Sequence, residues 1–276
     1  MKPVALTIAG SDPSGGAGIQ ADLKTFHQFG VYGEAVITLI TVQNTRRVSR
    51  VELLDPALVR EQIEAVLEDI PPGAIKTGAL GSAALIETVA AVLTAQSQAP
   101  PLVVDPVMVS KHGAPLIAAE AAGLLRTRLL PLAALVTPNI PEAEALTGLT
   151  IRTIDDARRA ATAILALGPR AVLVKGGHFT GSADDLLLTD AGEEVLYPGP
   201  RIDTRHTHGT GCTYSAAITA LLASHLPLFA AVASAKSFIA AAIASNPGLG
   251  AGSGPVNHHA PVTHPTTGSE PRKPLS

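Results

Sequence analysis

Short apolar runs recur along the chain, and each is nearly continuous rather than alternating with polar residues. Six such runs lie at residues 4–10, 34–43, 73–78, 101–107, 133–139 and 170–177. This pattern is typical of strands buried on both faces, as in a parallel sheet. Segments with helical periodicity lie between the runs, among them residues 55–69, 82–96 and 153–167. The alternation of strand and helix predicts an α/β fold, a three-layer αβα sandwich around a mainly parallel sheet.

Two later runs, "DDLLLTD" and "EEVLYPG", are separated only by Ala191 and Gly192. A two-residue connection of this kind predicts a hairpin, which would form an antiparallel edge of the sheet. No internal repeat and no linker rich in Pro, Gly or Ser interrupts the chain before its end, so residues 1–258 are expected to form a single domain. Residues 259–276 lose the apolar periodicity and are predicted to form a mobile C-terminal tail.

The composition excludes several classes of protein. The chain has 20 basic and 23 acidic residues and a net charge of -3, so a nucleic acid is not expected as a partner. No apolar stretch reaches the roughly 20 clean residues of a membrane span. One cysteine cannot form an intramolecular disulfide, and the first residues lack the apolar core of a secretory signal. A cytoplasmic protein with a large core is expected.

Polar and glycine-rich segments follow the predicted strands. In an open α/β sheet the carboxyl ends of the parallel strands share one edge, and ligands bind there. We therefore expect these segments to form one site; they are "SDPSGGAGIQAD" after the first strand, "QNT" after the second, Asp105-Pro106, Asn139 to Glu142, Lys175 to His178, and "GTGC" after the hairpin.

The first glycine cluster does not match a nucleotide-binding fingerprint. In "GSDPSGG" the spacing from Gly10 to Gly15 is that of a Walker loop, but Gly16 stands where that loop needs its lysine. "GGAG" does not give the dinucleotide pattern either. The cluster is either a tight turn or part of a ligand site. Four polar residues beside it favour the second interpretation: Ser11, Asp12, Gln20 and Asp22.

The segment Gly209-Thr210-Gly211-Cys212 is a stronger candidate for anion binding. Small residues let backbone N–H groups converge, and a helix predicted to start near Cys212 would add its positive end. The same field would lower the pKa of the Cys212 thiol and make it a base. Two alternatives remain: Cys212 packs as a small buried residue, or it binds zinc together with His206 and His208.

Two carboxylates on the same edge are candidates for magnesium. Asp105 follows a buried strand, and Glu142 lies in the first turn of a helix that begins beside Pro141. Each has a structural alternative, Asp105 as a turn residue and Glu142 as a helix-dipole partner. Lys175 either approaches a phosphate or is a solvated strand end. His178, Lys111 and His112 are treated as loop residues.

The motifs together resemble bacterial hydroxymethylpyrimidine/phosphomethylpyrimidine kinases, thiamine-pathway members of the ribokinase-like superfamily. The resemblance covers residues 4–258 and rests on "TIAGSDPSGGAGIQADLKTF", "QNT", "DPVM", "TPNIPEAEALTG", "VLVKGGH" and "THGTGCT". It implies a ribokinase-like fold and MgATP-dependent phosphorylation of 4-amino-5-hydroxymethyl-2-methylpyrimidine, first to the monophosphate and then to the diphosphate.

The resemblance also implies roles for residues of this chain. Gln43 would bind the pyrimidine, and Gly10, Ala17, Asp22, Ala79 and Val107 would line its pocket. Asn139, Lys175 and Gly177 would bind ATP, Asp105 and Glu142 would hold Mg²⁺, and Gly209 to Cys212 would form the anion hole. Cys212 stands where many relatives in the superfamily have a catalytic aspartate. A homodimer is also expected.

Two positions depart from the family pattern. Ala79 stands in "KTGAL" where the family often has methionine, and Arg47 stands where it tends to have glycine. Both concern the pyrimidine pocket or a flap over it, so they affect substrate selectivity. The alternatives are a pyridoxal or pyridoxine kinase of the same superfamily and a non-catalytic pyrimidine-binding sensor. "GTGC" and "NIPE" argue against the sensor, because a sensor needs no triphosphate site.

Overall fold

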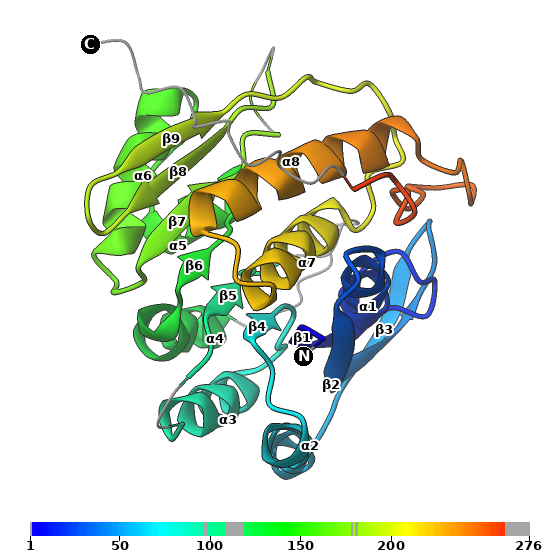
Figure 1. The fold of residues 1–276 in the computed structure, drawn as a ribbon, viewed down its shortest axis with the longest axis vertical. Helices are drawn as coiled ribbons and strands as arrows, with labels where there is room; N and C mark the ends of the chain where they lie inside the picture. The colour runs from blue at the N-terminus through cyan, green and yellow to red at the C-terminus, as the bar shows by residue number, and fades with distance from the viewer. Residues whose placement is uncertain (1, 97–98, 109–118, 178, 180–181, 263–276) are drawn as a thin grey trace.

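The computed structural model describes residues 2–96, 99–108, 119–177, 179 and 182–262. These residues form one sheet with helices on both faces (Figure 1). The strands are β1 (Val4–Ser11), β2 (Tyr32–Gln43), β3 (Val48–Leu53), β4 (Ala74–Thr77), β5 (Leu102–Val104), β6 (Leu135–Val136), β7 (Ala171–Val174), β8 (Asp185–Thr189) and β9 (Glu194–Tyr197). The α/β sandwich expected from the sequence is thus confirmed.

The nine strands found in the described residues follow the order β3-β2-β1-β4-β5-β6-β7-β8-β9. The pairs from β2 through β1 and β4 to β7 are parallel, and β2 with β3, β7 with β8 and β8 with β9 are antiparallel. The hairpin predicted from "DDLLLTD" and "EEVLYPG" is β8 and β9, at one edge. The opposite edge strand, β3, was not predicted.

The helices begin where the sequence carries capping residues. Three helices, α2 (Pro56–Asp69), α3 (Ala83–Thr94) and α6 (Ile154–Leu165), each have a side-chain cap. The side chains of Asp55, Ser82 and Thr153 accept a hydrogen bond from a backbone N–H in the first turn, which satisfies an amide that helix geometry leaves without a partner. The helical segments are α1 (Gly18–Gln28), α2 (Pro56–Asp69), α3 (Ala83–Thr94), α4 (Ala119–Leu124), η1 (Leu125–Leu129), η2 (Leu130–Leu132), α5 (Ile140–Thr147), α6 (Ile154–Leu165), α7 (Thr210–Ala223) and α8 (Leu228–Ala244).

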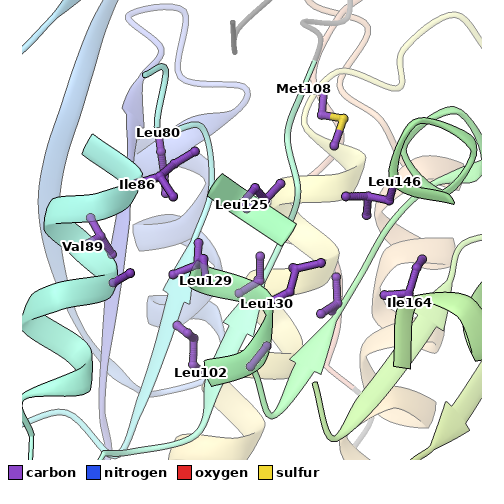
Figure 2. Close-up of a cluster of buried hydrophobic side chains, with 14 of the residues drawn as sticks. Leu80, Ile86, Val89, Leu102, Met108, Leu125, Leu129, Leu130, Leu146 and Ile164 are labelled. Carbon is purple, nitrogen blue, oxygen red and sulfur yellow. The ribbon is translucent and has the colours of Figure 1, made fainter. Parts of the chain in front are cut away.

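Hydrophobic side chains from alternate strand positions fill two layers, one on each face of the sheet. Val103 of β5 packs with α7 and α8, whereas its neighbours Leu102 and Val104 pack with α2 to α6 on the other face. Figure 2 shows part of the second layer, where Leu129 and Leu130 lie above the strands. Burial on both faces is the physical reason that the strand runs are continuously apolar.

The packed part of the chain extends past the boundary predicted at residue 258. Ala260 is fully buried, and Val262 packs against the core layer of α7 and α8. The backbone carbonyl of Ala260 also accepts a hydrogen bond from Gln28 in α1 at 2.9 Å. Residues 259–262 are therefore part of the fold and not of a tail, and residues 263–276 lie outside the described residues. Within the described residues, no helix combines the length and the apolar character needed to cross a bilayer.

Candidate active site

A cavity of about 640 Å³ lies at the carboxyl edge of the parallel strands. Its wall is built by the segments that follow β1, β4, β5, β6 and β7, together with residues of β2 and the start of α7. This edge is where an open α/β sheet binds its ligands. All but one of the site residues predicted from the sequence line it; these are Gly10, Ala17, Gln43, Ala79, Asp105, Val107, Asn139, Glu142, Lys175, Gly177, Gly209, Thr210, Gly211 and Cys212.

The anion-binding loop has a backbone that requires glycine. Gly209 has φ +79°, and a Cβ there would lie 1.7 Å from the carbonyl oxygen of Gly16, so no other residue fits. α7 begins at Thr210, two residues before the predicted start. The Thr210 N–H bonds the carbonyl of residue 207 at 3.3 Å. The amides of Gly211 and Cys212 lie in the first turn of α7, where helix geometry leaves N–H groups available to an anion.

The first glycine cluster is both a structural turn and a wall of the cavity. Gly18 has φ +58°, and a Cβ there would lie 2.2 Å from the carbonyl oxygen of Gly10. The backbone N–H of Asp12 donates to Gln20 at 2.8 Å, and the Asp12 carboxylate accepts hydrogen bonds from the backbone and side chain of Ser14. The polar residues beside the glycines hold the loop against α1. The cluster is therefore a tight turn that also forms part of the cavity wall.

Asp105 and Lys175 form an ion pair beside the anion loop. The Nζ of Lys175 lies 3.0 Å from the Asp105 carboxylate, which also accepts a hydrogen bond from Ser215 of α7 at 3.2 Å. A Cβ on Gly211 would lie 3.5 Å from that Nζ. Burial lowers the pKa of Lys175, but the Asp105 and Glu142 carboxylates outweigh this effect and hold it above its usual value. Lys175 therefore stays charged at the position where a phosphate would approach.

Asn139 and Glu142 form the capping box at the start of α5. The Glu142 N–H donates to Asn139 Oδ1 at 2.9 Å, and the Asn139 N–H donates to Glu142 Oε2 at 2.8 Å. Glu142 thus has the structural role considered above, and it lines the cavity as well. Burial raises its pKa to about 7, and the charge of Asp105 adds to this shift while Lys175 opposes it.

These carboxylates fit a magnesium ion. Glu142 and Asp105 repel each other inside a buried wall, and a divalent cation would relieve that repulsion. In the described part of the chain, no three His, Cys, Asp or Glu side chains gather as a metal site. His206, His208 and Cys212 are therefore not gathered as the zinc alternative requires. A magnesium ion bound through two carboxylates would complete its coordination with water or phosphate oxygens, as is usual for this ion.

Asp22 is the predicted site residue that does not line the cavity. It is fully buried behind the wall, where its carboxylate accepts hydrogen bonds from Lys76 Nζ at 2.8 Å and from Thr7 at 2.7 Å. Its position differs from the pocket role that the family resemblance implies. Lys76, which does line the cavity, was missed in the sequence. The available signal was a lysine inside the short apolar strand β4, where it needs a buried partner.

The Cys212 thiol is less acidic than the sequence predicts. The sulfur accepts a hydrogen bond from the Gly18 N–H, and Lys76 also favours the thiolate, yet burial outweighs both and raises the pKa of Cys212 to about 12. Asp22 and Asp105 shift the pKa in the same direction as burial. The predicted lowering of this pKa is therefore wrong, because burial and the carboxylates together exceed the helix field.

Gln43 ends β2 and meets a buried histidine from the other end of the chain. The Nε2 atoms of Gln43 and His208 lie 3.2 Å apart, and the same His208 nitrogen lies 2.7 Å from Asp12 Oδ2. His208 thus lines the cavity beside Gln43. Three residues that the sequence assigned to loops, His178, Lys111 and His112, fall outside the described residues.

Comparison with known proteins gives consistent results. The family model described as phosphomethylpyrimidine kinase matches residues 12–257. The hydroxymethylpyrimidine/phosphomethylpyrimidine kinase of Streptomyces coelicolor is 50% identical over 256 residues, covering 93% of this chain and 94% of that protein. The crystal structure of phosphomethylpyrimidine kinase from Clostridium difficile 630 has a TM-score of 0.77 at 48% identity, covering 86% of this chain and 98% of that one.

A pyridoxal kinase has the same fold. The ADP complex of the Bacillus subtilis enzyme matches with a TM-score of 0.86 at 39% identity, covering 94% of this chain and 98% of that one. Its sequence identity to this chain is lower than that of the two pyrimidine kinases. The matched family model begins at Asp12 in the first loop and ends after α8, so it includes most of the cavity wall. The chain belongs to the phosphomethylpyrimidine kinase family.

Proposed function

We propose that this phosphotransferase converts 4-amino-5-hydroxymethyl-2-methylpyrimidine to its monophosphate and then to its diphosphate, with MgATP as the donor, for thiamine biosynthesis. The observation that carries the proposal is the segment 208–212, which joins two chemically different halves of one cavity. His208 contacts Gln43 on one side, and Gly211 lies against Lys175 and Asp105 on the other. A kinase needs this juxtaposition of a ring-binding half and a phosphate-binding half.

Each half has residues suited to its task. Gln43 offers an amide donor and acceptor to an aminopyrimidine edge. Asn139, Lys175 and Gly177 lie on the side proposed for ATP, and the Gly211 and Cys212 amides would stabilise charge on the transferred phosphoryl group. A magnesium ion held by Asp105 and Glu142 would neutralise charge on the triphosphate. Cys212 is proposed to accept the proton of the attacking hydroxyl.

The second phosphorylation uses the same cavity with a different nucleophile. A phosphate monoester has its second pKa near 6, so the attacking oxygen is already deprotonated at neutral pH. This step needs the anion loop and the cation but no base. The two steps should therefore differ in their dependence on Cys212.

A pyridoxal or pyridoxine kinase is the main alternative, and a non-catalytic sensor is the second. A coupled assay with purified protein, MgATP and either the hydroxymethylpyrimidine or pyridoxal separates all three. We expect a higher kcat/KM for the pyrimidine, followed by formation of the diphosphate. Turnover of pyridoxal alone would overturn the assignment of substrate, and turnover of neither, with pyrimidine binding retained, would favour the sensor.

We also propose that residues 1–258, with the four residues that follow, work as one kinase domain in the cytoplasm, where ATP and vitamin precursors meet.

A homodimer is supported by apolar side chains exposed at the β3 edge of the sheet, among them Val42 at 55% and Leu53 at 45% exposure. Light scattering should give twice the chain mass of 28.1 kDa. A mass equal to that of one chain would contradict the dimer.

A further inference from the structure

Gln43 is held from behind by two hydrogen-bonded groups. His208, which is 3% exposed, places its Nε2 atom 3.2 Å from the Gln43 amide and 2.7 Å from Asp12 Oδ2. On the other side of the amide, Thr41 Oγ1 lies 3.3 Å from Gln43 Oε1 and donates its own hydrogen to the carbonyl of Ser11 at 2.9 Å. The amide therefore has one neighbour at each of its two polar atoms.

The Asp12 carboxylate needs a hydrogen-bond donor at the His208 nitrogen that faces it. Burial raises the pKa of Asp12, but the hydrogen bonds from His208 and Ser14 outweigh burial and leave the pKa below its usual value. Asp12 is thus an ionised acceptor, with no hydrogen to give. The Nε2 of His208 must carry a hydrogen to bond it at 2.7 Å.

The donor on His208 in turn determines which way the Gln43 amide faces. A hydrogen on Nε2 of His208 would be repelled by the amide NH₂ group and attracted by the amide oxygen. At the other end, Thr41 Oγ1 uses its hydrogen on Ser11 and can accept from an NH₂ group. The structure places Gln43 Nε2 against His208 and Oε1 against Thr41, and exchanging these two amide atoms makes both contacts complementary. The Nε2–H of His208 is then shared between Asp12 and the amide oxygen, and the NH₂ group faces Thr41 Oγ1.

We propose that Asp12 and His208 are positioning residues that hold the Gln43 amide in this one orientation and so make the site selective for an aminopyrimidine over a pyridine. The inference rests on the proposed function, in which Gln43 binds the substrate ring. With the amide fixed, its remaining lone pair lies on the His208 side and its remaining N–H on the Thr41 side. An amino group next to a ring nitrogen matches this order, whereas a pyridine with no such amino group cannot use both.

The test compares two substrates in four proteins. The substrates are the 4-amino-5-hydroxymethyl-2-methylpyrimidine and an analogue with hydrogen in place of the 4-amino group. In the parent protein, removing the amino group should lower kcat/KM by roughly 10- to 100-fold, the range for leaving a buried polar group unpaired. In His208→Phe and Asp12→Asn, removing the amino group should lower kcat/KM by less than about 3-fold. The change should be in the KM for the pyrimidine, while the KM for ATP is retained.

His258→Phe is the matched control. It removes another buried histidine, whose Nε2 contacts Thr213 of α7 at 3.1 Å and which does not line the cavity, so its discrimination should equal that of the parent. The inference is wrong if removing the 4-amino group lowers kcat/KM in both His208→Phe and Asp12→Asn as much as in the parent. If His208→Phe does not fold, the result for Asp12→Asn is sufficient. Calorimetry with both pyrimidines separates the two proposals. If the parent binds the pyrimidine without turnover, the proposed function fails and the affinities still test the inference; if it binds neither, both fail.

Discussion

The first phosphorylation should accelerate about tenfold for each pH unit between pH 6.5 and 9, with no plateau. The reason is the Cys212 thiol, whose pKa is raised to about 12 by burial. If the thiolate accepts the hydroxyl proton, the rate follows the thiolate fraction. That fraction is about 10⁻⁴ at pH 8 and rises in proportion to hydroxide throughout the range, because the pH stays well below the pKa.

The second phosphorylation provides an internal control in the same protein. Its phosphate nucleophile has a pKa near 6, so its rate should be nearly constant above pH 7. Cys212→Ala should lower the first step by roughly 10²- to 10⁴-fold, the range for a removed acid-base group, and should remove its pH dependence. The same variant should affect the second step much less.

Single-turnover quench measurements at saturating MgATP separate the chemical step from product release. Cys212 is the only cysteine in the chain, so its alkylation by iodoacetamide reports the thiolate directly. Both the alkylation rate and the first-step rate should rise in parallel with pH. A plateau of the catalytic rate below pH 9 with bound substrates, absent from the alkylation profile, would show that the bound ligands lower this pKa. A Cys212→Ala variant with the parent rate would refute the base assignment.

Four further outcomes are expected. Gln43→Ala should weaken pyrimidine binding by roughly 1–3 kcal/mol without changing ATP affinity in calorimetry, and loss of ATP binding instead would place Gln43 on the wrong side of the site. Glu142→Gln should raise the Mg²⁺ concentration for half-maximal rate, and an unchanged Mg²⁺ titration would leave Glu142 only its capping role. Lys76→Met should cost about 3–5 kcal/mol in urea unfolding by leaving Asp22 buried and unpaired, whereas Lys76→Met with Asp22→Leu should recover most of it unless the pair itself stabilises the fold. Burial lowers the pKa of His258 to about 4, so between pH 6.5 and pH 4 the unfolded chain takes up this proton and the folded chain does not. The contribution of His258 to the free energy of unfolding should therefore fall by about 2.5 kcal/mol from pH 7 to pH 4.5, and urea unfolding of His258→Gln should lack this pH dependence.

The parts of the fold that the sequence predicts are those with local causes. The buried strand β7 is a continuous apolar run, and Ser82 and Thr153 cap helices that begin one residue later. The strand β3 was missed because Val48–Leu53 is short, is largely exposed and carries Arg50 and Glu52. Its strand conformation comes from antiparallel pairing with β2, which is a tertiary interaction that no local pattern reports.

The parts of the site that the sequence did not predict are contacts between distant segments of the chain. His208 and Asp12 are separated by 196 positions, and only the fold brings them together behind Gln43. Lys76 and Asp22 are 54 positions apart and form a pair that neither local segment predicts. The glycine loop was predictable, because Gly209 needs a backbone that only glycine adopts without strain and its requirement is local.

The pKa of Cys212 depends on local groups and also on burial and charges from distant segments, which is why its predicted direction was wrong. The helix field and the Gly18 N–H are local and favour the thiolate, as the sequence suggests. The opposing groups, Asp22 and Asp105, come from distant segments, and one of them is already paired with Lys76. A thiolate would place another negative charge in this surrounding, so the thiol stays protonated at rest. A cation held at Asp105 would offset one of the opposing charges and lower this pKa only part of the way, so the first-step rate should still rise with pH up to pH 9.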